Sequence, residues 1–344
     1  MISEKPQQYL TEDFLEEFEI ALANEVNSFE NKVQRMIKFV VDNKGKRLRP
    51  LRVHSCCNIK YHSTKQDIIK ASVIVELIHI ATLIHDDVID NAKVRRNQST
   101  LHGIVDANEA ILVGDILLSH ALEIASSFSD TTVCREVSKA TKATCIGEVN
   151  QSFAQKKYDT TYEEYEQILR GKTGKLFACA CRLGAKLSNA DESVVGYVTR
   201  FAENLGIAYQ LYDDTIDLFG SETNSHKTLK TDLKTGKVTL PVITLLESCC
   251  EEERRPIIEM LTNYDAMTYK LNDIFEAYNI KQKCRNQEIR RIRSQWKNRR
   301  TRRPFAAWWP LFRNTHSHLA MMGECLLLDA CSMGHGSRFG GHGS

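Results

Sequence analysis

The chain has 344 residues, 42% of them hydrophobic, which predicts a globular protein with one large domain or two ordinary ones. The sequence shows no secretory signal and no apolar run of membrane-spanning length, so secreted and membrane-spanning classes are not expected. The eleven cysteines form no C-x-x-C motif, which argues against a zinc ribbon. Together these features favour a cytoplasmic protein. The net charge of +2 is unevenly placed, because residues 281–344 carry 13 Lys and Arg against 3 Asp and Glu.

Helices are predicted throughout residues 1–280. No proline occurs between Pro50 and Pro241, and a stretch that long without a helix breaker favours an all-α domain. Apolar side chains cover much of the girth of a helix predicted over residues 68–84, as expected for the central helix of a bundle. Further predicted helices cover residues 14–40, 108–127, 132–154, 161–187, 193–218 and 240–250. The predicted fold is a large antiparallel helix bundle.

Two copies of one acidic pattern, D-D-x-x-D, are the strongest functional signal. The first is Asp86-Asp87-Val88-Ile89-Asp90, the second is Asp213-Asp214-Thr215-Ile216-Asp217, and each follows an apolar run. Positions i and i+4 share a helix face, so Asp86 with Asp90, and Asp213 or Asp214 with Asp217, would present carboxylates to one point. Such clustered charges need a cation, and hard oxygen ligands suit Mg²⁺, which takes its remaining ligands from water and substrate phosphates. One such motif alone is more often a solvated acidic face.

Basic residues near the motifs are candidate ligands of diphosphate. Lys46 and Arg49 lie three positions apart and can converge on one phosphate group. Arg95 and Arg96 follow the first motif, and their guanidinium forks suit diphosphate oxygens. One diphosphate would be bridged to the aspartates by Mg²⁺, and a second would be held by Lys46, Arg49 and Arg96 without metal. Three further cations surround the second motif in the sequence: Lys172, Lys227 and Lys237.

The order and spacing of these segments resemble those of the trans-prenyltransferases, the polyprenyl diphosphate synthases. Besides the two motifs, the resemblance is carried by K-G-K-R-L-R-P at residues 44–50, T-L-H-G at residues 100–103, Y-Q-L-Y at residues 209–212 and D-L-K-T-G-K-V-T-L-P at residues 232–241. It covers about residues 30–250 and implies the all-α bundle of the isoprenoid synthases. It also implies a Mg²⁺-dependent transferase that joins isopentenyl diphosphate head to tail to an allylic prenyl diphosphate.

The resemblance assigns a role to each candidate residue. His79 joins Lys46 and Arg49 on isopentenyl diphosphate, and the allylic diphosphate falls to Lys172, Lys227 and Lys237. Arg95 and Arg96 also count as substrate-binding residues. Three Mg²⁺ ions are expected, with Asp86, Asp90 and Asp213 as ligands. The catalytic set is Asp86, Asp87, Asp90, Asp213, Asp214, Asp217, Thr173 and Gln210, the last two lying near the cationic carbon.

The residues just before the first motif bear on product length. In short-chain members of the family a bulky aromatic stands four or five positions before that motif, whereas this chain has Thr82 and Ala81 there. Small residues leave the apolar tunnel open, which predicts a product longer than twenty carbons. A geranylgeranyl or farnesyl diphosphate synthase is the alternative. A terpene cyclase is disfavoured because the second motif keeps its aspartates, and a non-catalytic partner subunit is disfavoured because all six aspartates are present.

Residues 281–344 form a basic tail that departs from the family pattern. Eleven basic residues lie between Lys281 and Arg303, followed by Trp308-Trp309. A surface helix, a peripheral membrane contact that would aid product release, and a reading frame shifted after about residue 283 are the alternatives favoured over a nucleic-acid arm, so no nucleic acid is expected as a partner. The resemblance implies a homodimer, with residues 108–127 as its candidate surface, and a heteromer stays open.

Overall fold

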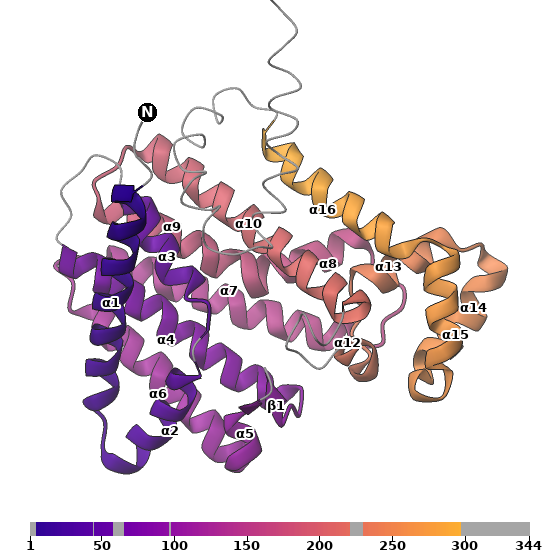
Figure 1. Cartoon of the computed structure of the whole chain (residues 1–344), viewed down its shortest axis with the longest axis horizontal. Helices are drawn as coiled ribbons and strands as arrows, with labels where there is room; N and C mark the ends of the chain where they lie inside the picture. The colour runs from indigo at the N-terminus through magenta and orange to yellow at the C-terminus, as the bar shows by residue number, and fades with distance from the viewer. Residues whose placement is uncertain (1–4, 44, 58–64, 96–97, 221–229, 297–344) are drawn as a thin grey trace, which may run out of the picture. The chain divides into compact units, whose positions relative to one another are not determined.

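The computed structural model describes residues 5–43, 45–57, 65–95, 98–220 and 230–296, and Figure 1 shows their arrangement. These residues are almost entirely helical, as predicted, with one short antiparallel hairpin between β1 (Val94–Arg95) and β2 (Gln98–Ser99). The helices are α1 (Lys5–Asn27), α2 (Asn31–Asp42), α3 (Leu48–Cys57), α4 (Lys65–Ile89), α5 (Leu101–Ile104), α6 (Ala107–Ser126), α7 (Thr132–Ala154), α8 (Tyr162–Leu169), the π-helical turn η1 (Arg170–Gly174), α9 (Lys175–Leu187), α10 (Glu192–Phe219), α12 (Thr231–Thr235), α13 (Leu240–Ser248), α14 (Glu251–Thr262), α15 (Tyr264–Ala277) and α16 (Ile280–Trp296).

The central helix of the bundle is α4, with α1, α3, α6 and α9 packed around it (Figure 1). Among the described helices it is the one long and apolar enough to cross a membrane, so the expectation that no segment has that length is wrong. However, 67% of its most apolar window is buried inside the protein. Its apolar girth is therefore covered by neighbouring helices, as expected for a core helix.

The predicted helix over residues 14–40 is in fact two helices, α1 and α2. They are separated by a short turn in which the Glu30 backbone is extended (φ −63°, ψ 149°). The Gln34 side-chain amide donates to Asn27 Oδ1 across this turn at 3.0 Å, and the Phe29 ring packs against His120 of α6 at 4.7 Å. Side chains that hydrogen-bond locally offer the backbone an alternative to helix, and apolar periodicity does not reveal such a break.

The predicted helix over residues 161–187 is interrupted by η1. At this point the chain crosses α7 so closely that a Cβ added to Gly147 would lie 2.3 Å from the backbone nitrogen of Lys172. A Cβ on Gly171 would lie 3.0 Å from the Gly147 Cα. Two glycines thus allow backbone contact where α7 meets η1. A single π turn inside a helix often marks a functional position, and η1 carries Lys172 and Thr173.

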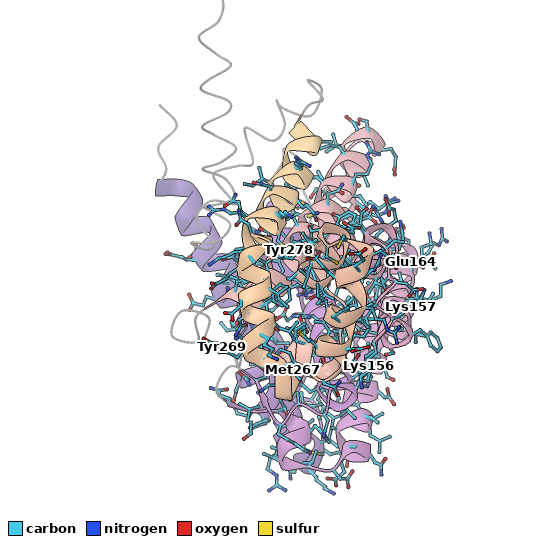
Figure 2. The ribbon with its side chains drawn as sticks, turned by 90° about the vertical axis from the view of Figure 1, so that its right-hand side faces the viewer. Lys156, Lys157, Glu164, Met267, Tyr269 and Tyr278 are labelled. Carbon is cyan, nitrogen blue, oxygen red and sulfur yellow. The ribbon has the colours of Figure 1, made fainter. Side chains whose placement is uncertain are left out.

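Buried apolar residues form two clusters within the compact unit Met1–Arg285. The first joins α1 to α7 and α9, and the second joins α8, the C-terminal half of α10 and α12 to α15. Figure 2 shows the side of the molecule where Tyr269 points outward, 80% exposed, and where Lys157 lies beside Glu164 at 3.4 Å. The first aspartate motif ends a helix of the first cluster, and the second lies on a helix of the second cluster.

The second unit begins at Asn286, so its described part is the C-terminal portion of α16. Residues 297–344, including Trp308 and Trp309, lie outside the described residues. The division between a bundle of residues 1–280 and a tail of residues 281–344 stays a prediction.

Candidate active site

The first aspartate motif lies at the C-terminal end of α4, where each carboxylate meets a different cation. Asp87 is buried and accepts hydrogen bonds from Arg95 of β1, at 2.8 Å from Nε and 2.7 Å from Nη2. Burial raises the pKa of the Asp87 carboxyl, and Arg95 opposes that rise. Arg95 is thus held within the motif, where it orients Asp87 and adds positive charge beside Asp86 and Asp90.

Lys237 connects the first motif to the segment between α12 and α13. Its Nζ donates to Asp90 Oδ2 at 2.6 Å. Asp232 lies in α12, just before this segment, and burial raises the pKa of its carboxyl well above the usual range, with Asp214 and Asp217 adding to the rise and Lys237 opposing it. Lys237 therefore acts on Asp90 of the first motif and on Asp232, whose carboxyl in turn interacts with Asp214 and Asp217 of the second motif.

Lys172 of η1 is the second cation between the motifs. Its Nζ lies 2.9 Å from Glu148 Oε2, 2.7 Å from Gln151 Oε1 and 3.8 Å from Asp86 Oδ2. Burial lowers the pKa of the Lys172 ammonium, but Asp86 and Glu148 outweigh this and the net shift is upward. The ammonium is therefore charged at neutral pH, and it contacts side chains of both α4 and α7.

A chain of hydrogen bonds holds the centre of the second motif. Thr173 donates to Gln210 Oε1 at 3.0 Å, and Gln210 Nε2 donates to Asp214 Oδ1 at 2.8 Å. The buried Tyr165 hydroxyl donates to the other oxygen of Asp214. Burial raises the pKa of Asp214 to about 6, against the hydrogen bonds from Tyr165 and Gln210 and the charge of Lys172. The orientation of the Gln210 amide is thereby fixed at both ends.

Asp217, the last residue of the second motif, holds the start of α12. Its Oδ1 accepts from the Thr231 hydroxyl at 2.8 Å and from the Thr231 backbone nitrogen at 3.4 Å, and its Oδ2 accepts from the Asp232 backbone nitrogen at 3.1 Å. A carboxylate that accepts from the first N–H groups of a helix satisfies donors that have no intrahelical partner. Asp217 therefore orders the segment that leads to Lys237.

The residues predicted to bind isopentenyl diphosphate lie at the start of α3 and on α4. Lys46 is exposed, and His79 is half-buried. The Arg49 guanidinium lies 4.8 Å from the centroid of the Phe177 ring. Burial lowers the pKa of Arg49 to about 10, and Glu76 opposes the fall, so the guanidinium stays charged at neutral pH. Arg49 therefore places a positive charge close to Phe177 of α9 and within the field of Glu76 of α4.

The two predicted chain-length residues are small and lie one turn before the first motif. Ala81 is fully buried, and the Thr82 hydroxyl donates to the His79 carbonyl of the same helix at 2.8 Å. Two predicted ligands of diphosphate, Arg96 and Lys227, lie outside the described residues.

The carboxylates suit a divalent cation. Asp86 Oδ1 is buried and has no hydrogen-bond partner among the described residues, although Oδ2 of the same carboxylate faces Lys172. Burial, and then repulsion by Asp86, raises the pKa of Glu148 to about 7, and Lys172 and Lys237 oppose the rise. Within the described ranges no three His, Cys, Asp or Glu side chains are arranged to hold an ion by themselves. An ion here would complete its coordination with water and phosphate oxygens, as Mg²⁺ does.

Four residues of this region were missed by the sequence reasoning: Glu148, Gln151, Tyr165 and Asp232. Glu148 and Gln151 are three apart on α7, so a face with both could have been noticed, but helix faces with polar residues are common. In the sequence Tyr165 is indistinguishable from an ordinary core aromatic, and only the structure shows that its hydroxyl donates to Asp214. Asp232 belongs to the segment 232–241, which resembles the family, but the resemblance assigned no role to this aspartate.

Comparison with known proteins gives one consistent result. A model of the polyprenyl synthetase family matches residues 30–278. The short chain isoprenyl diphosphate synthase of Methanocaldococcus jannaschii is 32% identical over 254 residues, covering 72% of this chain and 76% of that protein. The geranyl-diphosphate-specific all-trans-nonaprenyl-diphosphate synthase of Rhodobacter capsulatus is 34% identical, covering 64% and 68%. A polyprenyl synthase structure from Caulobacter crescentus, in complex with calcium and isoprenyl diphosphate, has a TM-score of 0.77 at 24% identity, covering 85% of this chain and 91% of that one.

Proposed function

Because the chain belongs to the polyprenyl synthetase family, whose members are Mg²⁺-dependent prenyltransferases, we propose that it condenses isopentenyl diphosphate with an allylic prenyl diphosphate, head to tail. The observation that carries this proposal is the placement of Lys172 and Lys237. Each cation contacts the first motif, Lys172 also acts on Asp214 of the second motif, and Lys237 acts on Asp232, whose carboxyl interacts with Asp214 and Asp217. A site with acids on two sides and cations between them is suited to a metal-bridged diphosphate.

Asp86, Asp90 and Asp213 would hold Mg²⁺, three ions in the proposed complex, and bound Mg²⁺ supplies Lewis-acid stabilisation of the departing diphosphate. The support in this chain is the partnerless Asp86 Oδ1 and the repulsion between the carboxylates of Asp86 and Glu148. Asp87 contributes indirectly, because it anchors Arg95 beside Asp86 and Asp90.

The protein's own cations divide between two substrates. Lys172 and Lys237, with Lys227, would bind the allylic diphosphate, while Lys46, Arg49 and His79, with Arg96, would bind isopentenyl diphosphate. As the allylic C–O bond breaks, its electron pair leaves with the diphosphate, and Lys172 and Lys237 stabilise that charge. The isopentenyl double bond then forms the new carbon–carbon bond to the allylic carbocation, and a proton is lost to the released diphosphate. The product is five carbons longer.

Gln210 and Thr173 would face the carbocation with oriented dipoles. The Gln210 oxygen is engaged by Thr173 and its amide nitrogen by Asp214, so the side chain cannot rotate freely. A fixed dipole costs no reorganisation during the reaction, which is how preorganised polar groups stabilise developing charge.

We propose a product longer than twenty carbons, because no bulky side chain stands at Ala81 or Thr82. The Thr82 hydroxyl donates to the His79 carbonyl of its own helix. This bond keeps the Thr82 side chain against α4, so it takes little space from the tunnel. Relatives of this chain include both short-chain and nonaprenyl enzymes, so product length has to be measured for this chain. A product of fifteen or twenty carbons would contradict the length proposal and leave the condensation proposal intact.

A homodimer is proposed on the exposed apolar faces of α6 and α7. Ile146, Val149 and Phe153 lie along one face of α7, with Phe153 79% exposed, and Leu112 is 60% exposed on α6. Exposed apolar side chains at helical spacing are typical of a surface that another protein covers. Light scattering of the purified chain separates a homodimer from a monomer that requires a different subunit.

We also propose a cytoplasmic localisation, with peripheral membrane contact during product release.

The function is tested by incubating the purified protein with Mg²⁺, isopentenyl diphosphate and allylic primers of several lengths, followed by sizing of the products. Linear products lengthened by multiples of five carbons support the proposal. Cyclic hydrocarbons would indicate a terpene cyclase instead. No product from any primer, with the protein folded and in its native oligomeric state, would indicate a non-catalytic partner subunit.

A further inference from the structure

We propose that Arg47 is a positioning residue that aligns Lys46 and Arg49 with His79, and that it is not itself a ligand of diphosphate. The inference rests on the proposed function, because those three residues are the proposed ligands of isopentenyl diphosphate. In the sequence Arg47 is one of several basic residues in a row and has no feature that distinguishes it from its neighbours. In the structure its environment differs from theirs completely.

The Arg47 guanidinium is buried, with 7% of the side chain exposed, and lies between the carboxylates of Glu19 and Glu76. Its Nε donates to Glu19 Oε1 at 2.8 Å, and its Nη1 donates to Glu76 Oε1 at 2.9 Å. Its Nη2 donates to Glu19 Oε2 at 3.3 Å and to the Val41 carbonyl at 3.2 Å. These four bonds leave at most one of the five N–H groups for anything else. The guanidinium therefore cannot also hold a diphosphate in the bidentate way that suits arginine.

The backbone of Arg47 sets the start of α3. Its φ is 48°, in the left-handed region that is uncommon for residues other than glycine. Its carbonyl accepts the Leu51 backbone N–H at 3.1 Å, which closes the first turn of the helix. Lys46 immediately precedes this position, and Arg49 lies in the turn that it closes. The ion pairs of the side chain hold the unusual backbone conformation in place, and that conformation directs both neighbours.

The carboxylate partners of Arg47 lie on the elements that need to be aligned. Glu76 lies on α4 three positions before His79, so the two side chains share a face about 4.5 Å apart along the axis. Glu76 also opposes the fall in the pKa of Arg49, which places Arg49 within its field. Glu19 fixes the same guanidinium to α1. Arg47 thus joins the start of α3 to the part of α4 that carries His79.

A shift of Lys46 and Arg49 relative to His79 would affect one substrate. Lys172 and Lys237, the proposed ligands of the allylic diphosphate, are held by Glu148 on α7 and by Asp90 at the C-terminal end of α4, and among the described residues neither lysine has a hydrogen bond or ion pair with Arg47, Glu19 or Glu76. A defect at Arg47 is therefore expected to weaken isopentenyl diphosphate specifically. A general loss of stability would weaken both substrates together.

The test is steady-state kinetics of Arg47→Lys, which keeps the charge but loses the forked geometry. KM for isopentenyl diphosphate is expected to rise about tenfold, the equivalent of one lost hydrogen bond to a charged group, while KM for the allylic primer stays within about twofold. The matched control is Arg182→Lys, which removes a 2.9 Å Arg–Glu pair between α9 and α7, and it should change neither KM. Equal changes in both KM values for Arg47→Lys, or no change in either, would overturn the proposal.

Two further measurements keep the result interpretable. If Arg47→Lys does not fold, Glu19→Gln removes the charge of the partner while the guanidinium and Glu76 remain, and the same selective rise in KM is expected at a smaller size. If the wild-type protein shows no condensation, the proposed function fails but this inference is still tested by calorimetric titration with isopentenyl diphosphate. Binding weakened about tenfold by Arg47→Lys at an unchanged melting temperature would support the positioning role, and unchanged binding would contradict it.

Discussion

The two aspartate motifs have the same letters and occupy opposite environments. In the first motif, side chains of Arg95, Lys237 and Lys172 approach the three carboxylates. In the second, Asp214 and Asp217 are held by neutral donors, among them the Tyr165 hydroxyl and the backbone of the α12 start. Equal sequence spacing therefore places charge on a helix face without deciding what each charge does. Neighbours from distant parts of the chain decide that.

The difference suggests a division of labour between the motifs. The charges of the first motif are balanced by side-chain cations from other parts of the chain, which suits acids that exchange partners when metal and diphosphate bind. In the second, Asp214 and Asp217 fix other groups, namely the Gln210 amide and the start of α12, and we propose that the metal role falls to Asp213. Four substitutions test this comparison.

The largest effect is expected for Asp86→Asn. This change keeps the shape of the side chain but removes the charge from the oxygen that has no hydrogen-bond partner. Condensation is expected to fall by about 10³-fold in kcat/KM, a size typical of a lost electrostatic contact to the reacting group. The measurement is incorporation of labelled isopentenyl diphosphate, with Glu123→Gln on the exposed surface of α6 as the control. A loss smaller than tenfold would remove Asp86 from the metal-binding set.

The comparison is sharpened by the matched pair Asp90→Asn and Asp217→Asn, which alter the same position of each motif. Asp90→Asn breaks the ion pair with Lys237 and is expected to lower kcat/KM by about 10²-fold. Asparagine caps a helix about as well as aspartate, so Asp217→Asn is expected to keep activity within about tenfold. The measurement is kcat/KM of both variants at saturating Mg²⁺. Equal losses of kcat/KM in the two variants would contradict the division of labour between the motifs.

Tyr165→Phe tests the neutral support of the second motif. The ring still packs, but Asp214 loses a buried donor, which is expected to cost about 1–3 kcal/mol of unfolding free energy. Urea denaturation measures this cost, and Tyr269→Phe on the 80% exposed tyrosine is the matched control with no expected change. An unchanged unfolding midpoint for Tyr165→Phe would show that Asp214 does not depend on this hydroxyl.

The smallest effect concerns acid stability and provides the baseline for any comparison of the motifs across pH. His54 stacks on Phe14 at 4.1 Å, and burial lowers its pKa to about 4 from the usual 6.5. The unfolded chain therefore binds more protons between these pH values, so unfolding free energy falls as pH falls through that window. Between pH 8 and pH 5.5 the loss from this group is about 1 kcal/mol.

The measurement is urea denaturation at both pH values. In His54→Phe the loss between pH 8 and pH 5.5 should shrink by that amount, while the exposed substitution Glu252→Gln on α14 should leave it unchanged. A pH dependence in His54→Phe equal to that of the wild-type protein would show that His54 does not titrate in this window.

The family, the all-α fold and the location of the first motif at the end of a buried helix were predictable, because apolar periodicity and motif spacing are local properties of the sequence. The π turn at η1 was not, since it depends on Gly147 and Gly171 meeting across two helices. The capping role of Asp217 depends on its contact with Thr231, which lies fourteen residues later in the chain. Arg47 could not be told apart from Lys46 and Arg49, because only the folded chain brings Glu19 and Glu76 to it.

The most direct test of the central claim is the initial rate of isopentenyl diphosphate incorporation, measured with Mg²⁺ and with a chelator for the wild-type protein, Asp86→Asn and Asp217→Asn in parallel. The wild-type protein should form elongated products only with Mg²⁺. Asp86→Asn should lose nearly all of that rate, and Asp217→Asn should keep a measurable part of it. Incorporation by the wild-type protein in the presence of chelator, or full activity of Asp86→Asn, would contradict a metal–diphosphate site formed by the two motifs.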